Sequence, residues 1–223
     1  MSTYRYDTAL FDLDGTLTDS KEGIISCTKY ALAQMGRDIP SEETLLKFLG
    51  PPLVRSFHDY CGMSEEEARE ATRLFRVRYT DTGLFENRVY EGVPDMLGRL
   101  KAAGIRLATA TSKPEDYAVR ILTKFGLIGY FDFIGAATFD ETRHDKIAVL
   151  RYTLDKLDIK DSSKAIMVGD RRNDIEGAHH FGLKCIAVRY GYGNDEEFTT
   201  YKADIVVSTP NEAADVILNN AKL

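Results

Sequence analysis

The chain has 223 residues, of which 43% are hydrophobic and 29% charged, and its formal net charge is −6. This composition is ordinary for a globular protein, and the length suits one large domain or a core domain that carries a smaller one. The sequence contains no basic run, so we do not expect a nucleic-acid polymer as a partner.

The first predicted strand ends in two acidic residues. The run Thr8 to Asp12 is strand-like, and Asp14 follows it, with Gly15 allowing the backbone to turn away. Alternate residues of a strand face the same way, so Asp12 and Asp14 would lean toward one space unless the chain turns there. Because like charges that close resist ionising together, a hard divalent cation such as Mg²⁺ would stabilise the pair. We therefore hypothesise a nucleophile at Asp12, an acid/base at Asp14 and a metal beside them.

Two other interpretations of this stretch stay open at this point. Asp, Gly and Thr are common turn residues, so the strand could simply end in a polar turn. A calcium loop has a similar Asp-x-Asp start, but it needs a Glu at its twelfth position, which counted from Asp12 is Gly23.

The next part of the chain predicts a small all-helical unit, over roughly 20–85. A first helix ends near Gly36, and the turn Gly50-Pro51-Pro52 separates two shorter helices. Ser64 and Glu67 form a capping box in front of a longer helix.

From Val93 onward, helices alternate with short apolar strands. We expect strands at Ile105–Thr109, Phe131–Ile134, Ala165–Val168, Cys185–Val188 and Asp204–Val207. This alternation predicts a Rossmann-like α/β fold, a parallel sheet with helices on both faces, to which the first strand also belongs. The helical unit is then an insertion after the first strand. We predict a helical cap domain over 19–87 and an α/β catalytic core made of 1–18 and 88–223.

Ligands bind beyond the carboxyl ends of the strands in such a sheet, so the polar residues at those ends matter most. Hydroxyl, ammonium and carboxyl groups follow the later strands or begin the next helix: Thr111, Ser112, Lys113, Lys146, Asp170 and Asp174. We expect Ser112 and Lys113 at one helix start and Lys146 at another, where the helix dipole favours an anion. Each residue alone has an ordinary structural explanation. Together they fit a phosphate ester bound against Mg²⁺.

These motifs resemble those of the haloacid dehalogenase-like hydrolases that carry a helical cap after the first strand. The resemblance spans nearly the whole chain, and its four motifs correspond to Phe11–Leu17, Thr111, Lys146 and Gly169–Asp174. It implies that Asp12 attacks phosphorus to form an aspartyl-phosphate, and that Asp14 protonates the leaving oxygen and then activates water. Asp14 also argues against dehalogenase chemistry, which has no alkoxide to protonate.

The resemblance also implies which residues bind the ligands. Thr111 and Lys146 would bind the phosphoryl oxygens and orient Asp12. Mg²⁺ would be held by the Asp12 carboxylate, the Asp14 backbone carbonyl and Asp170, with support from Asp174.

A finer resemblance concerns the substrate. The segments Phe48–Leu53 and Arg189–Gly193 look like those of the phosphoglycolate phosphatase-like group, especially its 5′-nucleotidase-like members, although both also have ordinary uses as turns. Arg55 is a candidate for binding the substrate's carboxylate or base, or else a solvated arginine. Ser112 and Lys113 are candidates for the phosphate site, and Lys113 alternatively only flanks the helix.

The resemblance implies a Mg²⁺-dependent phosphatase of a small phosphorylated metabolite, either a phosphoglycolate-like acid or a 5′-nucleotide. A sugar phosphomutase with the same nucleophile and a non-catalytic binding protein on this fold are the alternatives. No apolar stretch approaches the roughly 20 residues of a membrane helix, and Met1–Asp7 lacks the apolar region of a signal peptide. The three cysteines form no disulfide or zinc pattern. We therefore expect a cytoplasmic monomer or homodimer that does not bind membranes.

Overall fold

The computed structural model describes residues 5–140 and 142–219, in which the chain divides into two compact units. One unit holds the described residues up to Thr18 and from Val89 onward, and the other runs from Asp19 to Arg88. We expect no signal peptide in Met1–Asp7, and residues 1–4 of that segment lie outside the described residues. No helix in the described ranges is long and apolar enough to cross a membrane.

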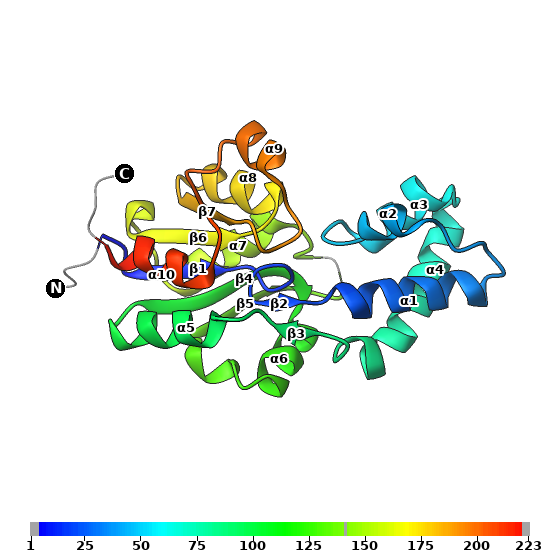
Figure 1. The fold of residues 1–223 in the computed structure, drawn as a ribbon, viewed down its shortest axis with the longest axis horizontal. Helices are drawn as coiled ribbons and strands as arrows, with labels where there is room; N and C mark the ends of the chain where they lie inside the picture. The colour runs from blue at the N-terminus through cyan, green and yellow to red at the C-terminus, as the bar shows by residue number, and fades with distance from the viewer. Residues whose placement is uncertain (1–4, 141, 220–223) are drawn as a thin grey trace. The chain divides into compact units, whose positions relative to one another are not determined.

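The first unit is built on a six-stranded sheet in the order β5-β4-β1-β6-β7-β8, whose strands pair in parallel (Figure 1). The strands are β1 (Thr8–Phe11), β4 (Arg106–Pro114), β5 (Phe133–Ala137), β6 (Ala165–Gly169), β7 (Lys184–Val188) and β8 (Ile205–Val207). Phe11, the last residue of β1, lies opposite Thr109 of β4 and Val168 of β6. The segments that follow β1 and β6 therefore leave the sheet at one carboxyl edge, beside the end of β4. The predicted α/β class is confirmed.

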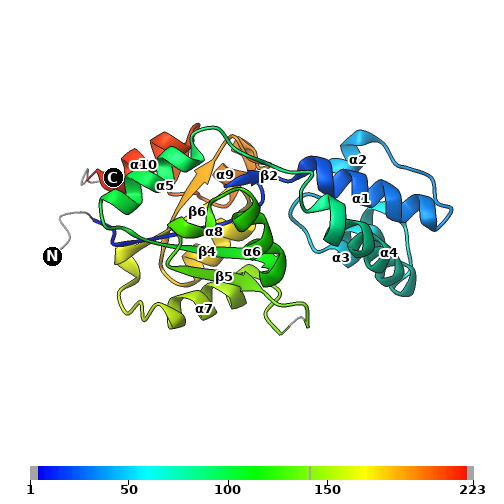
Figure 2. The ribbon, with the colours of Figure 1, turned by 90° about the horizontal axis from the view of Figure 1, so that it is seen from below.

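Helices cover both faces of this sheet. They are α5 (Val93–Ala102), α6 (Glu115–Lys124), α7 (Lys146–Lys156), α8 (Arg172–His180), α9 (Asp195–Thr200) and α10 (Pro210–Leu218), with short 3₁₀ turns η2 (Ile128–Tyr130) and η3 (Ser162–Lys164). Figure 2 shows α5 beside α10 on one face and α7 on the other, where α7 packs against α8. Helices on both faces explain why Ala165, Ile166, Met167 and Val168 are all buried.

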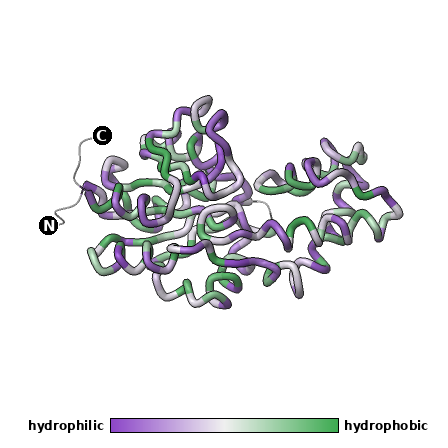
Figure 3. The backbone as a smooth tube through the Cα atoms, in the orientation of Figure 1, coloured by the Kyte–Doolittle hydropathy of each residue, from purple (hydrophilic) through white to green (hydrophobic). Residues whose placement is uncertain are grey.

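The second unit is helical. Its elements are α1 (Lys21–Gln34), α2 (Glu42–Leu46), α3 (Leu53–Cys61), α4 (Glu65–Arg78) and a π-helical turn η1 (Tyr79–Gly83). Hydrophobic and hydrophilic residues alternate along these helices in Figure 3, as expected when each helix buries one side. The predicted capping box is confirmed, since the Ser64 hydroxyl accepts from the Glu67 N–H and the Glu67 carboxylate accepts from the Ser64 N–H.

Two short strands, β2 (Thr18–Asp19) and β3 (Arg88–Val89), pair where the two units join in sequence. The Arg88 guanidinium lies 2.8 Å from the Asp19 carboxylate at this point. The sequence did not predict this pair or the π-helical turn, because neither has a periodic pattern long enough to stand out.

The predicted helix start at Ser112 and Lys113 is wrong. Both residues belong to β4, and α6 begins only at Glu115. The cause is Pro114, because a proline disfavours helical backbone at the residue before it and so keeps Lys113 extended. The other predicted start is confirmed: the Asp145 carboxylate accepts from the Ala148 N–H at 2.7 Å and caps α7.

Candidate active site at the carboxyl edge of the sheet

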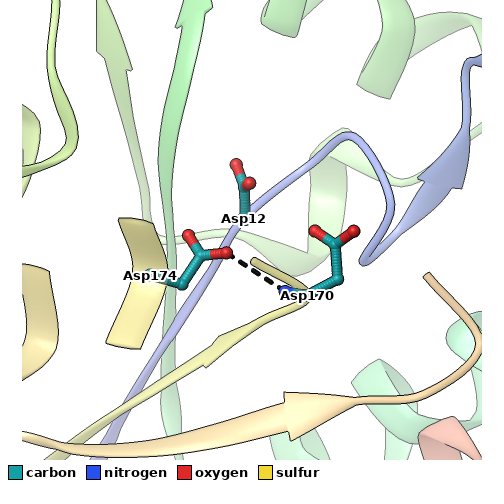
Figure 4. A group of neighbouring side chains, drawn as sticks. All are labelled: Asp12, Asp170 and Asp174. Carbon is teal, nitrogen blue, oxygen red and sulfur yellow. Dashed lines mark hydrogen bonds between the residues drawn. The ribbon is translucent and has the colours of Figure 1, made fainter. Parts of the chain in front are cut away.

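Three acidic side chains gather where β1 and β6 end. Asp12 follows β1, Asp170 follows β6, and Asp174 lies in the first turn of α8 (Figure 4). One carboxylate oxygen from each of them lies within 4.8 Å of the other two. Asp170 and Asp174 are buried, and Asp12 is partly exposed. Such a group of carboxylate oxygens is suited to a hard divalent cation.

Lys146, the first residue of α7, is the cation beside this cluster. Its Nζ lies 3.0 Å from Asp12 Oδ1 and 2.7 Å from Asp174 Oδ1, and it donates to the Ala110 carbonyl oxygen at 2.7 Å. Burial acts to lower the pKa of the Lys146 amine, but the carboxylates of Asp12 and Asp174 raise it above its ordinary value. An ammonium group has three N–H donors, and here three acceptors surround it.

The buried carboxylates carry more negative charge than Lys146 alone balances. Burial, followed by the charges of Asp174 and Asp12, raises the pKa of the Asp170 carboxyl well above its ordinary value. Burial also raises the pKa of Asp174 to about 6, although Lys146 acts to lower it. A divalent cation would favour the ionised form of these groups, so the residues present fit a Mg²⁺ ion.

Asp14 has a different partner from Asp12. The chain turns at Gly15, where φ is +84°, and a side chain at that position would overlap the Asp170 carboxylate. Immediately before Gly15, the Asp14 Oδ2 atom lies 2.9 Å from the Nζ of Lys113, whose side chain is buried. The two acids at the end of β1 are therefore held by two different lysines.

Three of the residues predicted for the phosphate lie at the end of β4, namely Thr111, Ser112 and Lys113. The Thr111 hydroxyl is buried and accepts from the Lys113 N–H at 3.2 Å, one residue beyond the carbonyl that Lys146 contacts. Ser112 is exposed, and Lys113 points to Asp14. The structure thus brings Thr111 and Lys113 to the same edge as the acids, while their roles toward a phosphate stay predictions.

Asp174 also supports the backbone of its neighbours. Its Oδ2 atom accepts from the Asp170 N–H at 3.1 Å, as Figure 4 shows, and from the Arg171 N–H at 3.0 Å. With Lys146 on its other oxygen, this carboxylate orients the turn that carries Asp170. Its predicted role in supporting a bound Mg²⁺ stays a prediction.

Arg55 lies in α3, within the helical unit. Its side chain is 70% exposed, and its Nε lies 3.1 Å from Asp59 Oδ2, one helical turn away. Contact with a substrate stays a prediction for this residue.

Comparison with protein families identifies the family of the chain. Residues 9–188, which include the whole carboxylate cluster, match the model of the haloacid dehalogenase-like hydrolases. The chain belongs to this family. The family that the sequence suggested is thus confirmed, and with it the prediction that the protein is a hydrolase.

Two relatives with different enzyme names illustrate the similarity of this chain to known proteins. A 5′-nucleotidase of Pseudomonas aeruginosa is 41% identical over 206 residues, which cover 90% of this chain and 93% of that protein. A phosphoglycolate phosphatase of Vibrio parahaemolyticus is 30% identical, with 95% of this chain and 96% of that protein covered. The crystal structure of a predicted phosphatase from Clostridium acetobutylicum superposes with a TM-score of 0.90 at 42% identity, covering 95% of this chain and 98% of that one.

Sequence reasoning missed two groups of this hydrolase that contact Asp170. The Tyr192 N–H donates to Asp170 Oδ2 at 2.7 Å, and the Thr16 hydroxyl donates to Oδ1 at 3.5 Å. Tyr192 lies in the Arg189–Gly193 segment, which the sequence related only to the choice of substrate. The only sequence signal was a tyrosine between two glycines after a strand. This pattern does not indicate which residue the backbone N–H of the tyrosine would contact.

Proposed function

We propose that this hydrolase is a Mg²⁺-dependent phosphatase that cleaves a small phosphate monoester through an aspartyl-phosphate on Asp12. One observation carries the proposal: the Asp12 carboxylate shares a single oxygen cluster with Asp170 and lies 3.0 Å from Lys146 Nζ. A carboxylate in such a setting is oriented, partly exposed and next to a place for a cation. The names of the related phosphatase and nucleotidase support this reaction class.

The metal site would use oxygens from both strand ends. The side chains of Asp12 and Asp170 and the backbone carbonyl of Asp14 would hold Mg²⁺, with support from Asp174. When bound, Mg²⁺ supplies positive charge that stabilises the transferring phosphoryl group.

In the first half of the reaction, an Asp12 oxygen forms a bond to phosphorus while the bond from phosphorus to the ester oxygen breaks. The Asp14 carboxyl gives its proton to that departing oxygen, and Thr111 binds a phosphoryl oxygen. Lys146 orients Asp12, since its Nζ lies within 3.0 Å of an oxygen atom of Asp12, of Asp174 and of the Ala110 carbonyl. In the second half, Asp14 takes a proton from water, which attacks phosphorus and releases phosphate and free Asp12.

From the names of the two relatives, we propose two kinds of substrate, a 5′-nucleotide and phosphoglycolate. Higher identity to the 5′-nucleotidase makes a nucleoside 5′-monophosphate the first to test. We also propose a cytoplasmic location, which the three free cysteines support.

The test is phosphate release from nucleoside 5′-monophosphates, sugar phosphates and phosphoglycolate, with kcat/KM measured for each in Mg²⁺. We expect a clear preference for one class and inorganic phosphate as the product. Phosphate that stays on a product sugar would instead indicate a phosphomutase. Absence of turnover with every ester would contradict the proposal.

A further inference from the structure

A loop outside the four main family motifs lies directly against Asp170. We call Arg189–Gly193, which follows β7, the glycine–tyrosine loop. Its Tyr192 N–H donates to Asp170 Oδ2 at 2.7 Å, a short hydrogen bond to a side chain that is 0% exposed. The Arg189 N–H donates to the Val207 carbonyl at 2.9 Å, so the start of the loop is tied to β8.

Gly191 permits this close approach. A Cβ at position 191 would collide with the Gly15 carbonyl oxygen and with Asp170 Cβ, and it would lie 2.7 Å from Asp170 Oδ2. The backbone at Gly191 is not in the left-handed region. The glycine is therefore needed for space and not for its backbone conformation, and an alanine there would have to displace either the turn after β1 or Asp170.

Tyr190 fastens the same loop to the turn that follows Asp12. Its hydroxyl donates to the Thr16 carbonyl oxygen at 3.1 Å, and its ring centre lies 4.9 Å from that of Tyr90. Burial raises the pKa of Tyr190, so the hydroxyl remains a neutral donor. The loop thus touches both segments that would supply metal ligands, the turn after β1 and Asp170.

We propose that the glycine–tyrosine loop is a positioning element that fixes the Asp170 carboxylate for a divalent cation and so sets the metal affinity of the site. The inference rests on the proposed function, which places Mg²⁺ at these carboxylates. A ligand that is already held in place loses less conformational freedom on binding, and outer contacts of this kind typically change metal affinity about 10- to 100-fold. We class the residues of the loop as positioning residues, because the contacts described act on Asp170 and on the turn after β1.

The test is the Kd of Mn²⁺ for the folded protein, measured by electron paramagnetic resonance. Competition with Mg²⁺ then gives the affinity for Mg²⁺. We expect Gly191→Ala to weaken Mn²⁺ binding roughly 10- to 100-fold. The matched control is Gly129→Ala in η2, where an added Cβ meets nothing within 4 Å, and its affinity should equal that of the wild type.

A second variant keeps the test decisive if Gly191→Ala does not fold, as judged by circular dichroism. Tyr190→Phe removes only the hydroxyl bond to Thr16, and we expect roughly 2- to 10-fold weaker Mn²⁺ binding from it. A purely structural role would lower the melting temperature of the folded variants but leave their affinity at the wild-type value, and that result would overturn the inference. If the wild type itself bound no Mn²⁺ or Mg²⁺, the proposed metal site would fail, and the role of the loop with it.

Discussion

Exposed ion pairs of the helical unit contrast with the buried ion pairs of Lys146 at the carboxyl edge of the sheet. In the helical unit, pairs such as Arg69–Glu65 and Arg73–Glu70 join exposed side chains one helical turn apart. At the edge of the sheet, Lys146 is buried among carboxylates. Exposed pairs typically contribute about 0–1 kcal/mol, whereas loss of one partner from a buried pair costs about 3–5 kcal/mol. The costly arrangement is found where the chemistry is proposed.

We expect the greatest loss of activity when a single acid of the buried cluster is neutralised. Asp12→Asn should lower the turnover of a chromogenic phosphate ester by roughly 10³-fold or more, because an amide is a far poorer nucleophile and metal ligand. Circular dichroism should show that the fold survives. Glu65→Gln, which neutralises an exposed acid of the helical unit, is the control and should keep wild-type turnover.

Removal of the metal tests whether the carboxylate cluster needs a divalent cation for activity and stability. We expect EDTA to abolish activity and Mg²⁺ to restore it, and full activity in EDTA would refute the metal's role. Mg²⁺ at 100 times its Kd should also raise the free energy of unfolding by roughly 2.7 kcal/mol, measured by urea denaturation. Asp170→Asn should lose most of this stabilisation, because it removes a proposed ligand.

Replacement of Lys146 tests how much the buried ion pairs contribute to the stability of the fold. Lys146→Met would leave the Asp12 and Asp174 carboxylates without their buried cation, so we expect the free energy of unfolding to fall by about 3–5 kcal/mol in metal-free buffer. Turnover should fall about 10²- to 10³-fold, because Asp12 loses the group that orients it. Lys160→Met removes one member of an exposed pair with Asp158 and should change neither quantity. Equal stability of the two variants would show that burial of Lys146 has no energetic consequence.

The smallest expected effect is at Arg55 of the helical unit. If this residue binds the leaving group, Arg55→Ala should raise KM about 10-fold for the true substrate and leave KM for a minimal aryl phosphate unchanged. Arg69→Ala, at an exposed pair of the same unit, should change neither KM. Equal effects of Arg55→Ala on both substrates would mean that Arg55 does not recognise the leaving group.

The sequence predicted the cluster because strand geometry determines it. Asp12 and Asp170 each follow an apolar run, and parallel neighbouring strands bring the ends of such runs to one edge. The cap of α7 at Asp145, just before Lys146, was visible for a similarly local reason. What these predictions have in common is that each depends on a few adjacent residues.

Contacts between segments that are distant in the chain could not be predicted from the sequence. The pairing of Asp14 with Lys113 depends on how far β4 continues, and Pro114 extended it past the predicted end. The approach of Gly191 to Asp170 depends on the path of a loop between two strands, which no short-range pattern specifies. The sequence also could not say what Arg55 contacts, since the spacing of an exposed residue does not define its partner.

The central claim is that Asp12 becomes phosphorylated during turnover. The most direct measurement is acid quenching of the enzyme during reaction with a radiolabelled phosphate ester, followed by peptide mapping. We expect a hydroxylamine-sensitive label on the peptide that contains Asp12, and none in Asp12→Asn. A label on a peptide without Asp12, or the same label in Asp12→Asn, would contradict it.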